Sequence, residues 1–533
     1  MASGISLLYP EGYESKTAQC MKNYDFLHSL QIDDMIVIKK TGYRGVKDID
    51  LKSLCSIDTE VLKYRLDVVG DLVENDRLFE IFNRALVLIY DINDMKRAIN
   101  VDFTTESALT CIRHLEMYQE IVDLFAEGFK DTEVSSVGMK RFKDHILSIY
   151  NGDDYKNLCL ELSAMETRFG NIRSITVGVN VDSYLQPKEA GILSINEEEF
   201  KEGTIIDRLI KKNNADPKMF MSGIFPLIKG LSPDENKAFN HSVSSALNRI
   251  YSKAIRDFEP LVNKYFNTST ADFVSILDDI RFLTAGVSFI RQMKELGFDM
   301  CKPEVRPVDQ KKCDLTGVYN PILARRKIEE VIVLNDFSYD ENGRFYLVTG
   351  PNHGGKSIFA YSVGMAQALF QLGLFVPAKS AAISPVTGIF THFPASDENN
   401  YGKGRLESEC ERLSGILKNI SDTDVLFMDE SFSSTSGLEG GYIASEVLSA
   451  IGVIGCGGIY VTHIHELAAK CDEYNSHEGN RGKIDNLVAV MEDKQSGKRS
   501  YRVIRTTPDG LSYAKDIARK YGLDYEGIIG NGP

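Results

Sequence analysis

The sequence predicts a multidomain protein in which an all-α module with a small β-containing insert is followed by an α/β domain. Two observations carry this prediction. Apolar residues recur at three- and four-residue intervals over much of residues 51–330, whereas short apolar strands alternate with glycine-rich turns and helices after about residue 331. The chain of 533 residues is also too long for one ordinary hydrophobic core. We therefore expect an N-terminal segment over residues 1–50, the helical module over 51–330 and the α/β domain over 331–533.

The composition is typical of a soluble globular protein and argues against several other classes. No apolar run approaches the roughly 18 residues of a membrane helix, and the start of the chain lacks the basic region of a signal peptide, so we expect a cytoplasmic protein with no membrane partner. The nine cysteines form no CxxC pair, which favours reduced thiols over a zinc site. A net charge of −15 argues against a surface that binds nucleic acid everywhere but allows a local basic patch.

Helical periodicity begins near residue 51 and continues to about residue 168. In DTEVLKYRLDVVGDLVENDRLFEIFNRAL the apolar positions fall on one helical face: Val61, Leu62, Leu66, Val69, Leu72 and Val73. The period then changes to two, because Ile175, Val177 and Val179 alternate with polar residues and a turn leads to a second extended run. This change predicts a small β-containing insert over about residues 171–230.

Two long helices are expected after the insert. SPDE at residues 232–235 combines an N-cap serine, a proline at the first helical position and the glutamate of a capping box. It predicts a helix from residue 232 to about 265, kinked at Pro260. A second helix is expected over residues 271–296. Helices of this length suit a lever, and an ordinary helical bundle is the alternative.

A glycine-rich loop marks the start of the α/β domain. In TGPNHGGKS, Gly350, Gly355, Lys356 and Ser357 fit the pattern GxxxxGK[ST], with a predicted strand before them and a predicted helix after them. Backbone N–H groups and a helix N-terminus bind anions in that context. We expect Lys356 to neutralise the β- and γ-phosphates of a nucleotide and the Ser357 hydroxyl to bind Mg²⁺.

Acidic and imidazole side chains end two further apolar strands. Asp429 and Glu430 follow the run at 425–428, so we expect Asp429 to support the metal and Glu430 to act as the general base that activates water. His463 follows the run at 459–461 and is positioned to sense the γ-phosphate. His392 and His465 are expected to be structural, and so is His353 on its residue type alone, although His353 lies inside the glycine-rich loop itself.

Five segments together resemble the ATPase domain of the MutS family, the ABC-type motor of DNA mismatch repair. They are TGPNHGGKS, GLFVPAKSAAISPVTGIFTHFPASD, VLFMDESFSSTSGLEG, YVTHIHEL and GLSYAKDIARKYGL, in the order and spacing of that family. The resemblance is dense over residues 331–528. Upstream it is weaker, and it implies a MutS-like core and lever with the β insert in the place of a DNA clamp.

The resemblance implies ATP and Mg²⁺ as ligands, with Glu430 and His463 as catalytic residues and Ser357 and Asp429 at the metal. It implies that the adenine lies near Ile332. It also implies a homodimer through the ATPase domains, in which each nucleotide site is completed by the other chain. The residues expected to bind the nucleotide are Gly350, Pro351, Asn352, His353, Gly354, Gly355, Lys356, Ser357 and, from the partner, Arg405.

The sequence departs from the family pattern at three places. Gly404 and Arg405 replace the Ser-Thr of the signature that acts across the dimer, and we hypothesise that Arg405 contacts the partner's phosphates instead. Phe432, Ser433 and Ser434 replace the usual Gly-Arg-Gly after the acidic pair, which affects the expected hydrolysis rate and subunit coupling. The N-terminal mismatch-reading domain and a C-terminal dimer-stabilising segment are expected to be missing.

The function expected from this resemblance is ATP-driven clamp or lever motion on mismatched, branched or otherwise distorted DNA. A Phe-x-Glu wedge is unsupported, because its two matches, at 125–127 and 200–202, are about the number expected by chance. The alternative is an ATP-dependent switch that engages a protein partner rather than DNA, which the acidic balance favours. A transporter-like or SMC-like ATPase is a weaker alternative, because no LSGGQ motif or long coiled coil occurs.

Overall fold

The structure is a computed structural model. It describes residues 5–13, 21–38, 48–98, 105–169, 174–181, 183–184, 187–196, 271–326, 332–352, 354–394, 404–493 and 498–507, with short stretches at 198, 201–202, 219–220, 264–265, 521–523, 525 and 528. The helix expected from residue 232 therefore lies outside the described residues except at 264–265. Most of the expected insert after residue 196, Phe200 and His353 also lie outside them.

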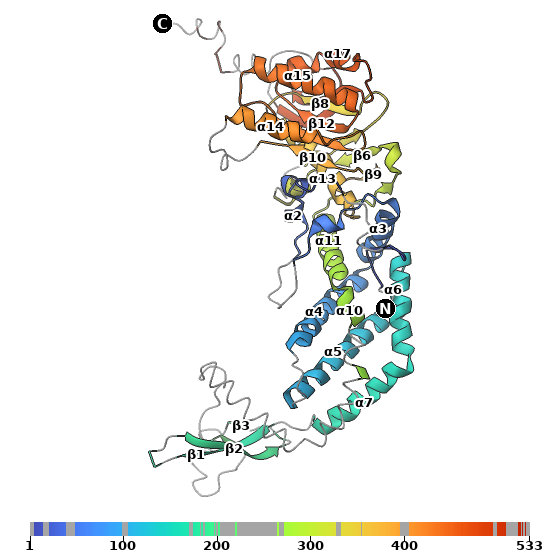
Figure 1. Ribbon diagram of the computed structural model, residues 1–533, viewed down its shortest axis with the longest axis vertical. Helices are drawn as coiled ribbons and strands as arrows, with labels where there is room; N and C mark the ends of the chain where they lie inside the picture. Colours follow the sequence, from blue (N-terminus) through green and yellow to red (C-terminus); the bar gives the residue numbers. More distant parts are fainter. Residues whose placement is uncertain are drawn as a thin grey trace.

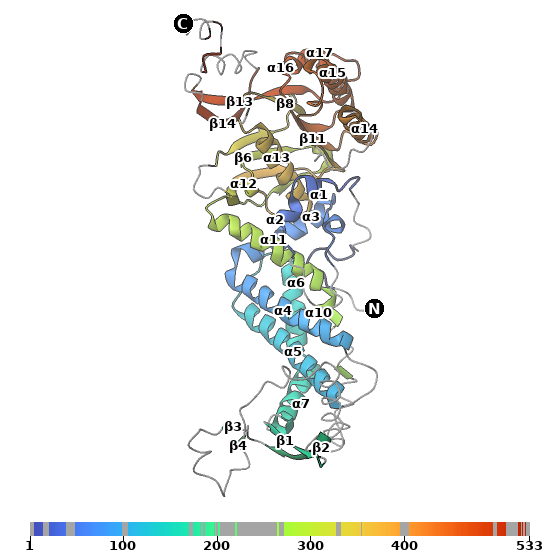
Figure 2. The same cartoon turned by 90° about the vertical axis from the view of Figure 1, so that its left-hand side faces the viewer.

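The molecule is elongated, with its two larger sheets at one end and a stalk of helices leading away from them (Figure 1, Figure 2). The sheet-bearing part, residues 301–507, contains the glycine-rich loop. The helical module, defined here as residues 59–169 and 271–295, forms the stalk. The hairpin of β1 (Ser174–Val181) and β2 (Pro187–Asn196) lies at the far end of the stalk.

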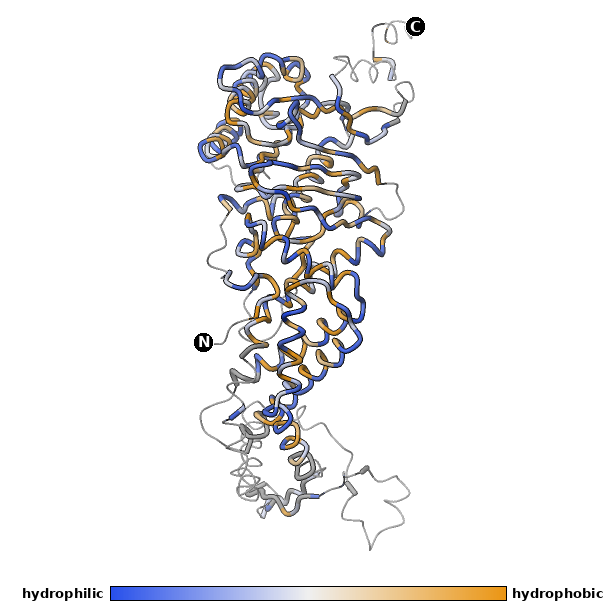
Figure 3. Tube along the Cα trace, turned by 90° about the vertical axis from the view of Figure 1, so that its right-hand side faces the viewer, coloured by the Kyte–Doolittle hydropathy of each residue, from blue (hydrophilic) through white to orange (hydrophobic). Residues whose placement is uncertain are grey.

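The described residues of 59–98 and 105–169 are mostly helical, where the sequence predicts helices. They are α3 (Thr59–Glu74), α4 (Asp76–Ala98), α5 (Thr105–Lys130), α6 (Val137–Asn151) and α7 (Asp153–Phe169). Along these helices the chain alternates between hydrophobic and hydrophilic stretches (Figure 3), as expected for helices with one buried face. The helical periodicity of the sequence is thus confirmed, whereas motion as a lever stays a prediction.

Side-chain hydrogen bonds cap the N-termini of α3 and α6, the two helix ends of this run that lie closest to the sheets. The Asp58 carboxylate accepts hydrogen bonds from the N–H groups of Glu60 and Val61 at the start of α3. Asp71, buried in α3, accepts bonds from the backbone N–H and the hydroxyl of both Ser135 and Ser136, at 2.6–3.0 Å. Ser136 in turn caps α6, so a single carboxylate fixes the start of α6 against α3.

The β insert contains an antiparallel pair, β1 with β2, in which Gly178 lies opposite Gly191. Two short strands follow and pair in parallel: β3 (Lys201–Glu202) and β4 (Met219–Phe220). A β-containing insert is therefore present where period-two alternation predicts it, and its role as a clamp stays a prediction.

The helix expected over 271–296 is interrupted. It consists of α10 (Ala271–Ser275) and α11 (Leu277–Glu295), and Ile276 between them takes φ −96° and ψ 3°. The Ile276 side chain is buried in the main core. The helix is therefore interrupted at a residue, Ile276, whose apolar side chain is buried.

The larger sheet has the strand order β10-β11-β12-β8-β13-β14. All neighbouring pairs are parallel except β13 with β14, which are antiparallel. The strands are β8 (Phe345–Thr349), β10 (Ile389–His392), β11 (Val425–Asp429), β12 (Gly457–Val461), β13 (Ile484–Asp493) and β14 (Lys498–Arg505). The helices that accompany them are α13 (Lys356–Gln371), α14 (Arg405–Leu417), α15 (Gly437–Ile454), α16 (His465–Ala468) and α17 (Cys471–Asn475).

A smaller four-stranded sheet crosses the boundary expected at residue 331. Its order is β5-β9-β6-β7, and β5 and β6 come from before that residue. The strands are β5 (Glu304–Val305), β6 (Cys313–Val318), β7 (Asn335–Ser338) and β9 (Ser380–Ile383), with α12 (Pro321–Arg326) between β6 and β7. Residues 304–318 thus pair with the α/β domain rather than with the helical module. The partner strand β9 follows in sequence only after α13, which is why local patterning places the boundary too late.

The N-terminal segment packs against both parts of the molecule. It contains short helices α1 (Phe26–Ser29) and α2 (Ile32–Met35). Lys22 forms an ion pair with buried Asp424 at 2.7 Å, ahead of β11. Ser6 and the Leu7 N–H donate to the Asp279 carboxylate of α11 at 2.7 and 2.8 Å, and burial raises the pKa of Asp279.

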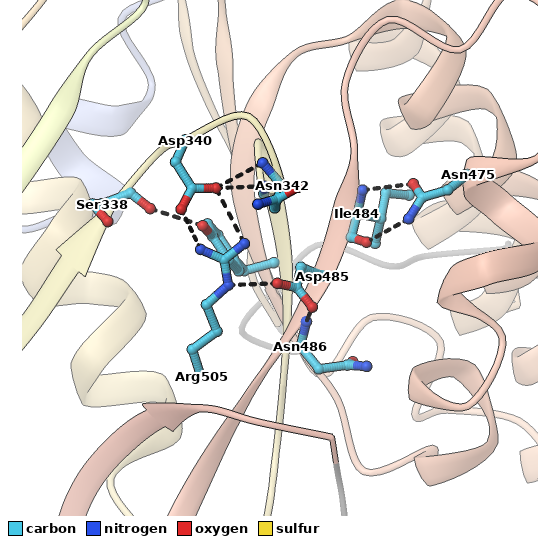
Figure 4. Close-up of polar contacts among 10 residues, drawn as sticks. Ser338, Asp340, Asn342, Asn475, Ile484, Asp485, Asn486 and Arg505 are labelled. Atoms are coloured by element: carbon cyan, nitrogen blue, oxygen red, sulfur yellow. Dashed lines mark hydrogen bonds and ion pairs between the residues drawn. The ribbon is translucent and has the colours of Figure 1, made fainter.

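An arginine ties the edge strand β14 to its neighbours. The Arg505 guanidinium lies between the Asp340 and Asp485 carboxylates (Figure 4) and forms ion pairs with both. Asp340 lies in the turn before β8, and its pKa is lowered chiefly by the hydrogen bond from Arg505. The β13–β14 hairpin is therefore fixed beside the strand that leads into the glycine-rich loop.

Among the described residues, α15 is the one helix whose length and hydropathy would allow it to span a membrane. It carries a capped N-terminus, where the Ser436 hydroxyl accepts from the Glu439 N–H. Ala444, Leu448 and Ile451 of this helix belong to the hydrophobic core that also contains Met428 of β11. These contacts are those of a helix packed on a sheet.

Candidate active site

The glycine-rich loop connects a fully buried strand to a buried helix. All five residues of β8 are buried, and α13 begins at Lys356 directly after the loop. Gly350 and Gly355 adopt φ values of +128° and +88°, which side chains rarely allow. A Cβ on Gly350 would lie 2.6 Å from the Ala489 carbonyl oxygen of β13, so glycine is required there.

Lys356 folds back over the loop. Its Nζ donates to the carbonyl oxygens of Gly350 and Pro351 at 2.9 and 3.0 Å. The side chain is buried, and burial lowers its pKa, while Glu430 and Asp429 act in the opposite direction. A buried ammonium group whose partners are neutral carbonyls is well placed to exchange them for phosphate oxygens.

The strand order brings the predicted acidic and imidazole residues to this loop. Because β12 lies between β8 and β11, the carboxyl ends of the three parallel strands meet at one edge of the sheet. The Ser357 hydroxyl donates to Asp429 Oδ1 at 2.9 Å, which joins the first turn of α13 to the end of β11. His463 follows β12, and its Nε2 lies 2.5 Å from Glu430 Oε1. The loop lysine, the serine, both carboxylates and His463 therefore lie together.

Asp429 is held in an electrostatically unfavourable place. Burial raises its pKa to about 6, and the neighbouring Glu430 carboxylate adds to this effect. The hydrogen bond from Ser357 and the charges of His463 and Lys356 oppose it. A carboxylate with this environment gains most when a cation arrives, because the cation removes the cost of ionisation.

The donor set fits Mg²⁺. Mg²⁺ prefers oxygen ligands, and the Ser357 hydroxyl and the Asp429 carboxylate supply two such atoms within hydrogen-bond distance of each other. The loop also fits phosphate oxygens, since a Cβ at Gly354 would come within 2.8 Å of the Pro351 carbonyl oxygen and close the loop. Ser357, Asp429 and the loop glycines thus have the chemistry that a magnesium nucleotide requires.

The remaining predicted residues are distributed around this group. Pro351 and Asn352 lie in the described part of the loop, Asn352 being exposed, whereas His353 lies outside the described residues. Arg405 begins α14, and its Nε is 4.0 Å from Glu409 Oε1. Ile332 is half-buried against the main core, and its contact with adenine stays a prediction.

Three neighbours of the site were not singled out in the sequence as functional. The Tyr501 ring of β14 packs 3.4 Å from the position of a Cβ on Gly355, and Tyr501 has a φ of +55°. His392, which the sequence suggests is structural, has its Nδ1 2.6 Å from the hydroxyl of Ser431, directly after Glu430. Glu409 accepts a hydrogen bond from the Phe432 N–H at 2.9 Å. No local pattern identifies these residues, because each contact joins distant parts of the chain.

Comparison with known proteins identifies the part of the chain that holds this site. Residues 346–523 match the family model described as MutS domain V. This part of the chain is therefore similar to a MutS domain V. The match includes β8, the glycine-rich loop, Asp429, Glu430 and His463, and it confirms the expected resemblance to the MutS family.

Curated relatives extend the similarity beyond the MutS domain V. The DNA mismatch repair protein MutS of Petrotoga mobilis is 24% identical over 551 residues, covering 95% of this chain and 64% of that protein. The proteins of the same name from Chlorobium phaeobacteroides and Clostridium kluyveri are each 32% identical, over 244 and 231 residues. Those two matches cover 45% and 42% of this chain but only 27% and 25% of the relatives. The chain thus spans less than two thirds of the length of the relatives it matches.

Proposed function

We propose that this protein is a MutS-like ATPase that hydrolyses ATP with Mg²⁺ and uses the reaction to change how it binds distorted or branched DNA. The observation that carries the ATPase part is the cluster at the carboxyl edge of β8, β12 and β11. There Lys356 donates a hydrogen bond to a loop carbonyl oxygen, Ser357 is hydrogen-bonded to Asp429, and Glu430 is hydrogen-bonded to His463. The DNA part rests on the similarity to proteins named for DNA mismatch repair.

Each residue of the cluster has a distinct role in this proposal. The loop N–H groups and Lys356 bind the phosphates, replacing the carbonyl partners of Lys356. Ser357 and Asp429 hold Mg²⁺, which when bound neutralises part of the phosphate charge. Glu430 takes the proton from the attacking water. The water oxygen can then bond to the γ-phosphorus while ADP leaves. The Nε2–H of His463 donates to Glu430 Oε1 and keeps the carboxylate oriented.

The proposal includes a homodimer through two MutS domains V. Arg405 begins α14 and its side chain is exposed, with its Nε 4.0 Å from Glu409 Oε1. We assign it to the phosphates of the nucleotide held by the partner subunit. Closure around two nucleotides would then pull on the helical module, whose helices lead away from the sheets toward the β1–β2 hairpin.

ATP hydrolysis by the purified full chain tests the enzymatic part. Lys356→Ala is expected to abolish nucleotide binding, because the loop loses its buried cation. Glu430→Ala is expected to bind ATP normally and to lower kcat by about 100-fold or more, as for loss of a general base. Glu407→Ala, on an exposed part of α14, is the matched control and should behave as the wild type. Unchanged ATP binding by Lys356→Ala would contradict the proposed site.

The same preparations test the nucleic-acid part with mismatched, branched and single-stranded DNA. We expect stimulation of hydrolysis by one class of DNA and binding that weakens steeply with salt, because phosphate contacts release counterions. Binding to none of these DNAs at low salt, with hydrolysis intact, would overturn the DNA part and favour a protein partner. The net charge of −15 is the observation that favours this second function, an ATP-dependent switch that engages a protein partner.

A further inference from the structure

The segment that follows β11 turns through two unusual backbone conformations. Glu430 has a φ of +48° and Phe432 a φ of +65°, and neither residue is glycine. Left-handed backbone is unfavourable for residues other than glycine. Such a conformation persists only where surrounding contacts determine it. Because Glu430 is the proposed general base, those contacts also determine where the base points.

Three side chains from other elements hold this turn. Glu409 Oε2 accepts from the Phe432 N–H at 2.9 Å. The Tyr460 hydroxyl donates to the Ser431 carbonyl oxygen at 3.0 Å. His392 Nδ1 lies 2.6 Å from the Ser431 hydroxyl, and its Nε2 lies 3.2 Å from the Glu409 carbonyl oxygen.

The hydrogen-bond partners of His392 fix its tautomer. The Glu409 carbonyl oxygen can only accept, so His392 Nε2 must carry the proton and donate to it. Nδ1 then accepts from the Ser431 hydroxyl. The ring is buried, and burial together with Arg412 lowers the pKa of His392 to about 4, so the neutral ring is the form present at neutral pH. His392 therefore links Ser431 to the backbone of α14.

Glu409 connects this turn to Arg405. The two residues lie one turn apart on α14, and Glu409 Oε1 is 4.0 Å from Arg405 Nε while Oε2 holds the Phe432 N–H. Arg405 is exposed and its contact with Glu409 is long, so this pair contributes little, whereas a hydrogen bond to a charged group contributes several times more. The bond to Phe432 is therefore the stronger one and survives when Arg405 engages another anion.

We propose that Glu409 is a positioning residue that couples Arg405 of a chain to Glu430 of the same chain. This inference rests on the proposed function. When Arg405 binds the partner's nucleotide, the first turn of α14 moves with it. Glu409 carries that movement to the Phe432 N–H, and the turn sets the Glu430 carboxylate for hydrolysis. His392 supports the same connection by tying Ser431 to the Glu409 backbone.

Two substitutions separate positioning from the general stability of the helix. Glu409→Ala removes the acceptor of the Phe432 N–H, and we expect kcat for ATP hydrolysis to fall by about 10- to 100-fold, as for a displaced catalytic group. The KM for ATP should change less than about threefold, since Lys356 and the loop are unaffected. Glu409→Gln keeps an acceptor oxygen and should recover most of the lost kcat. Equal loss in Ala and Gln variants, or a wild-type kcat in Glu409→Ala, would overturn the proposal.

Mixing of chains tests whether Glu409 acts within its own chain. A Glu409→Ala chain is mixed with a Lys356→Ala chain, so that the intact nucleotide loop and the missing Glu409 belong to the same chain. We expect no recovery of hydrolysis above the sum of the two separate chains. Recovery would mean that Glu409 acts only through the partner's site, which contradicts coupling to Glu430 in the same chain.

Hydrogen exchange provides a readout that does not depend on turnover. With a non-hydrolysable ATP analogue, peptides covering residues 430–432 should exchange faster in Glu409→Ala than in the wild type, while Glu407→Ala should match the wild type. Absence of this difference would contradict the role of Glu409 even if hydrolysis falls. If hydrolysis by the wild-type protein does not depend on Lys356, the proposed function is contradicted. The exchange rates still test whether Glu409 holds the Phe432 N–H, because they do not depend on hydrolysis.

Discussion

At the scale of single residues, the carboxyl group of Asp429 lies where burial disfavours its ionised form. Asp429 is almost fully buried at the end of β11, beside another carboxylate. Its pKa of about 6 lies above the ordinary value of 3.8, so the folded protein disfavours the ionised form that the proposed Mg²⁺ site needs. If Asp429 is the proposed metal ligand, this loss of stability accompanies that role.

Asp429→Asn is expected to stabilise the protein in the absence of nucleotide and Mg²⁺. Because the folded pKa is raised, the ionisation cost is absent below about pH 4 and complete above about pH 6. Urea unfolding should therefore show a gain of about 1–3 kcal/mol in the free energy of unfolding at pH 7.5 that fades as the pH falls to 4. Dependence of hydrolysis on Mg²⁺ should be lost in parallel.

Asp422→Asn supplies a control of opposite sign. The pKa of Asp422 is lowered, chiefly by the hydrogen bond from Lys311, so its ionised form stabilises the fold. This exposed pair should be worth only about 0–1 kcal/mol, and the substitution should cost that amount at pH 7.5. A loss of stability in Asp429→Asn like that in Asp422→Asn would contradict the assigned environment of Asp429.

Residues that end strands were predictable, and residues that support them were not. Asp429 and His463 each follow a short apolar run, Lys356 follows the loop after such a run, and parallel strands bring these positions to one edge. Glu409 looks in the sequence like any exposed helical charge, and His392 like a structural histidine. Their role depends on how α14 and β10 pack against the turn at 430–432, which no periodicity encodes.

At the scale of elements, α13 joins the nucleotide loop to the helical module. The helix starts at Lys356, and its last residue, Gln371, has a fully buried side chain. The Gln371 amide donates to the carbonyl oxygens of Ser56 and Val386 at 2.9 and 3.2 Å, and its oxygen accepts from the Val386 N–H at 3.0 Å. Ser56 lies just before α3, so one end of α13 lies at the glycine-rich loop and the other contacts the start of the helical module.

Gln371→Met is expected to lower the free energy of unfolding by about 2–4 kcal/mol, since it leaves several buried backbone groups without a partner while keeping the volume similar. Gln292→Met on α11, where the side chain is exposed, is the control and should change stability by less than about 0.5 kcal/mol. Urea unfolding measures both. Equal effects of the two substitutions would show that the Gln371 contacts carry little of the connection.

Local patterning predicted the elements better than their partners. The strands before the loop and before the acidic pair, and the helices over residues 59–169, appear where the sequence places them. The break at Ile276 and the pairing of β6 with β9 were not predicted, because burial against distant residues decides both. The N-terminal segment gave no signal of its contacts with Asp279 and Asp424 for the same reason.

At the scale of the whole molecule, one hydrophobic core runs from the N-terminal segment through the helical module into α13. A second core lies between the larger sheet and α15 and contains Phe432. The turn that holds Glu430 thus belongs to the core on the α14 and α15 side, while Lys356 begins the helix that enters the other core. The two cores lie on opposite faces of the larger sheet, because neighbouring residues of β11 such as Phe427 and Met428 belong to different cores. A shift of α14 and the turn at 430–432 against this sheet would change the distance between Glu430 and Lys356, which suits the proposed site that two chains complete.

Complementation between inactive chains tests that last point through Arg405. A Lys356→Ala chain keeps Arg405, and an Arg405→Ala chain keeps Lys356. If Arg405 acts across the dimer, each chain alone is inactive, but a mixed dimer contains one site with intact Lys356 and intact Arg405. In an equal mixture half of the dimers are mixed and half of their sites have both residues, so about one quarter of the wild-type rate is the upper limit of the recovery. We expect recovery above the separate chains but below that limit, because the chain that hydrolyses ATP lacks its own Arg405 and therefore the coupling through Glu409. If Arg405 acts within its own chain, no site in the mixture is intact and hydrolysis stays at the level of the separate chains. That result, or full activity of Arg405→Ala alone, would reject the composite site, whereas recovery above the separate chains requires that two chains share it.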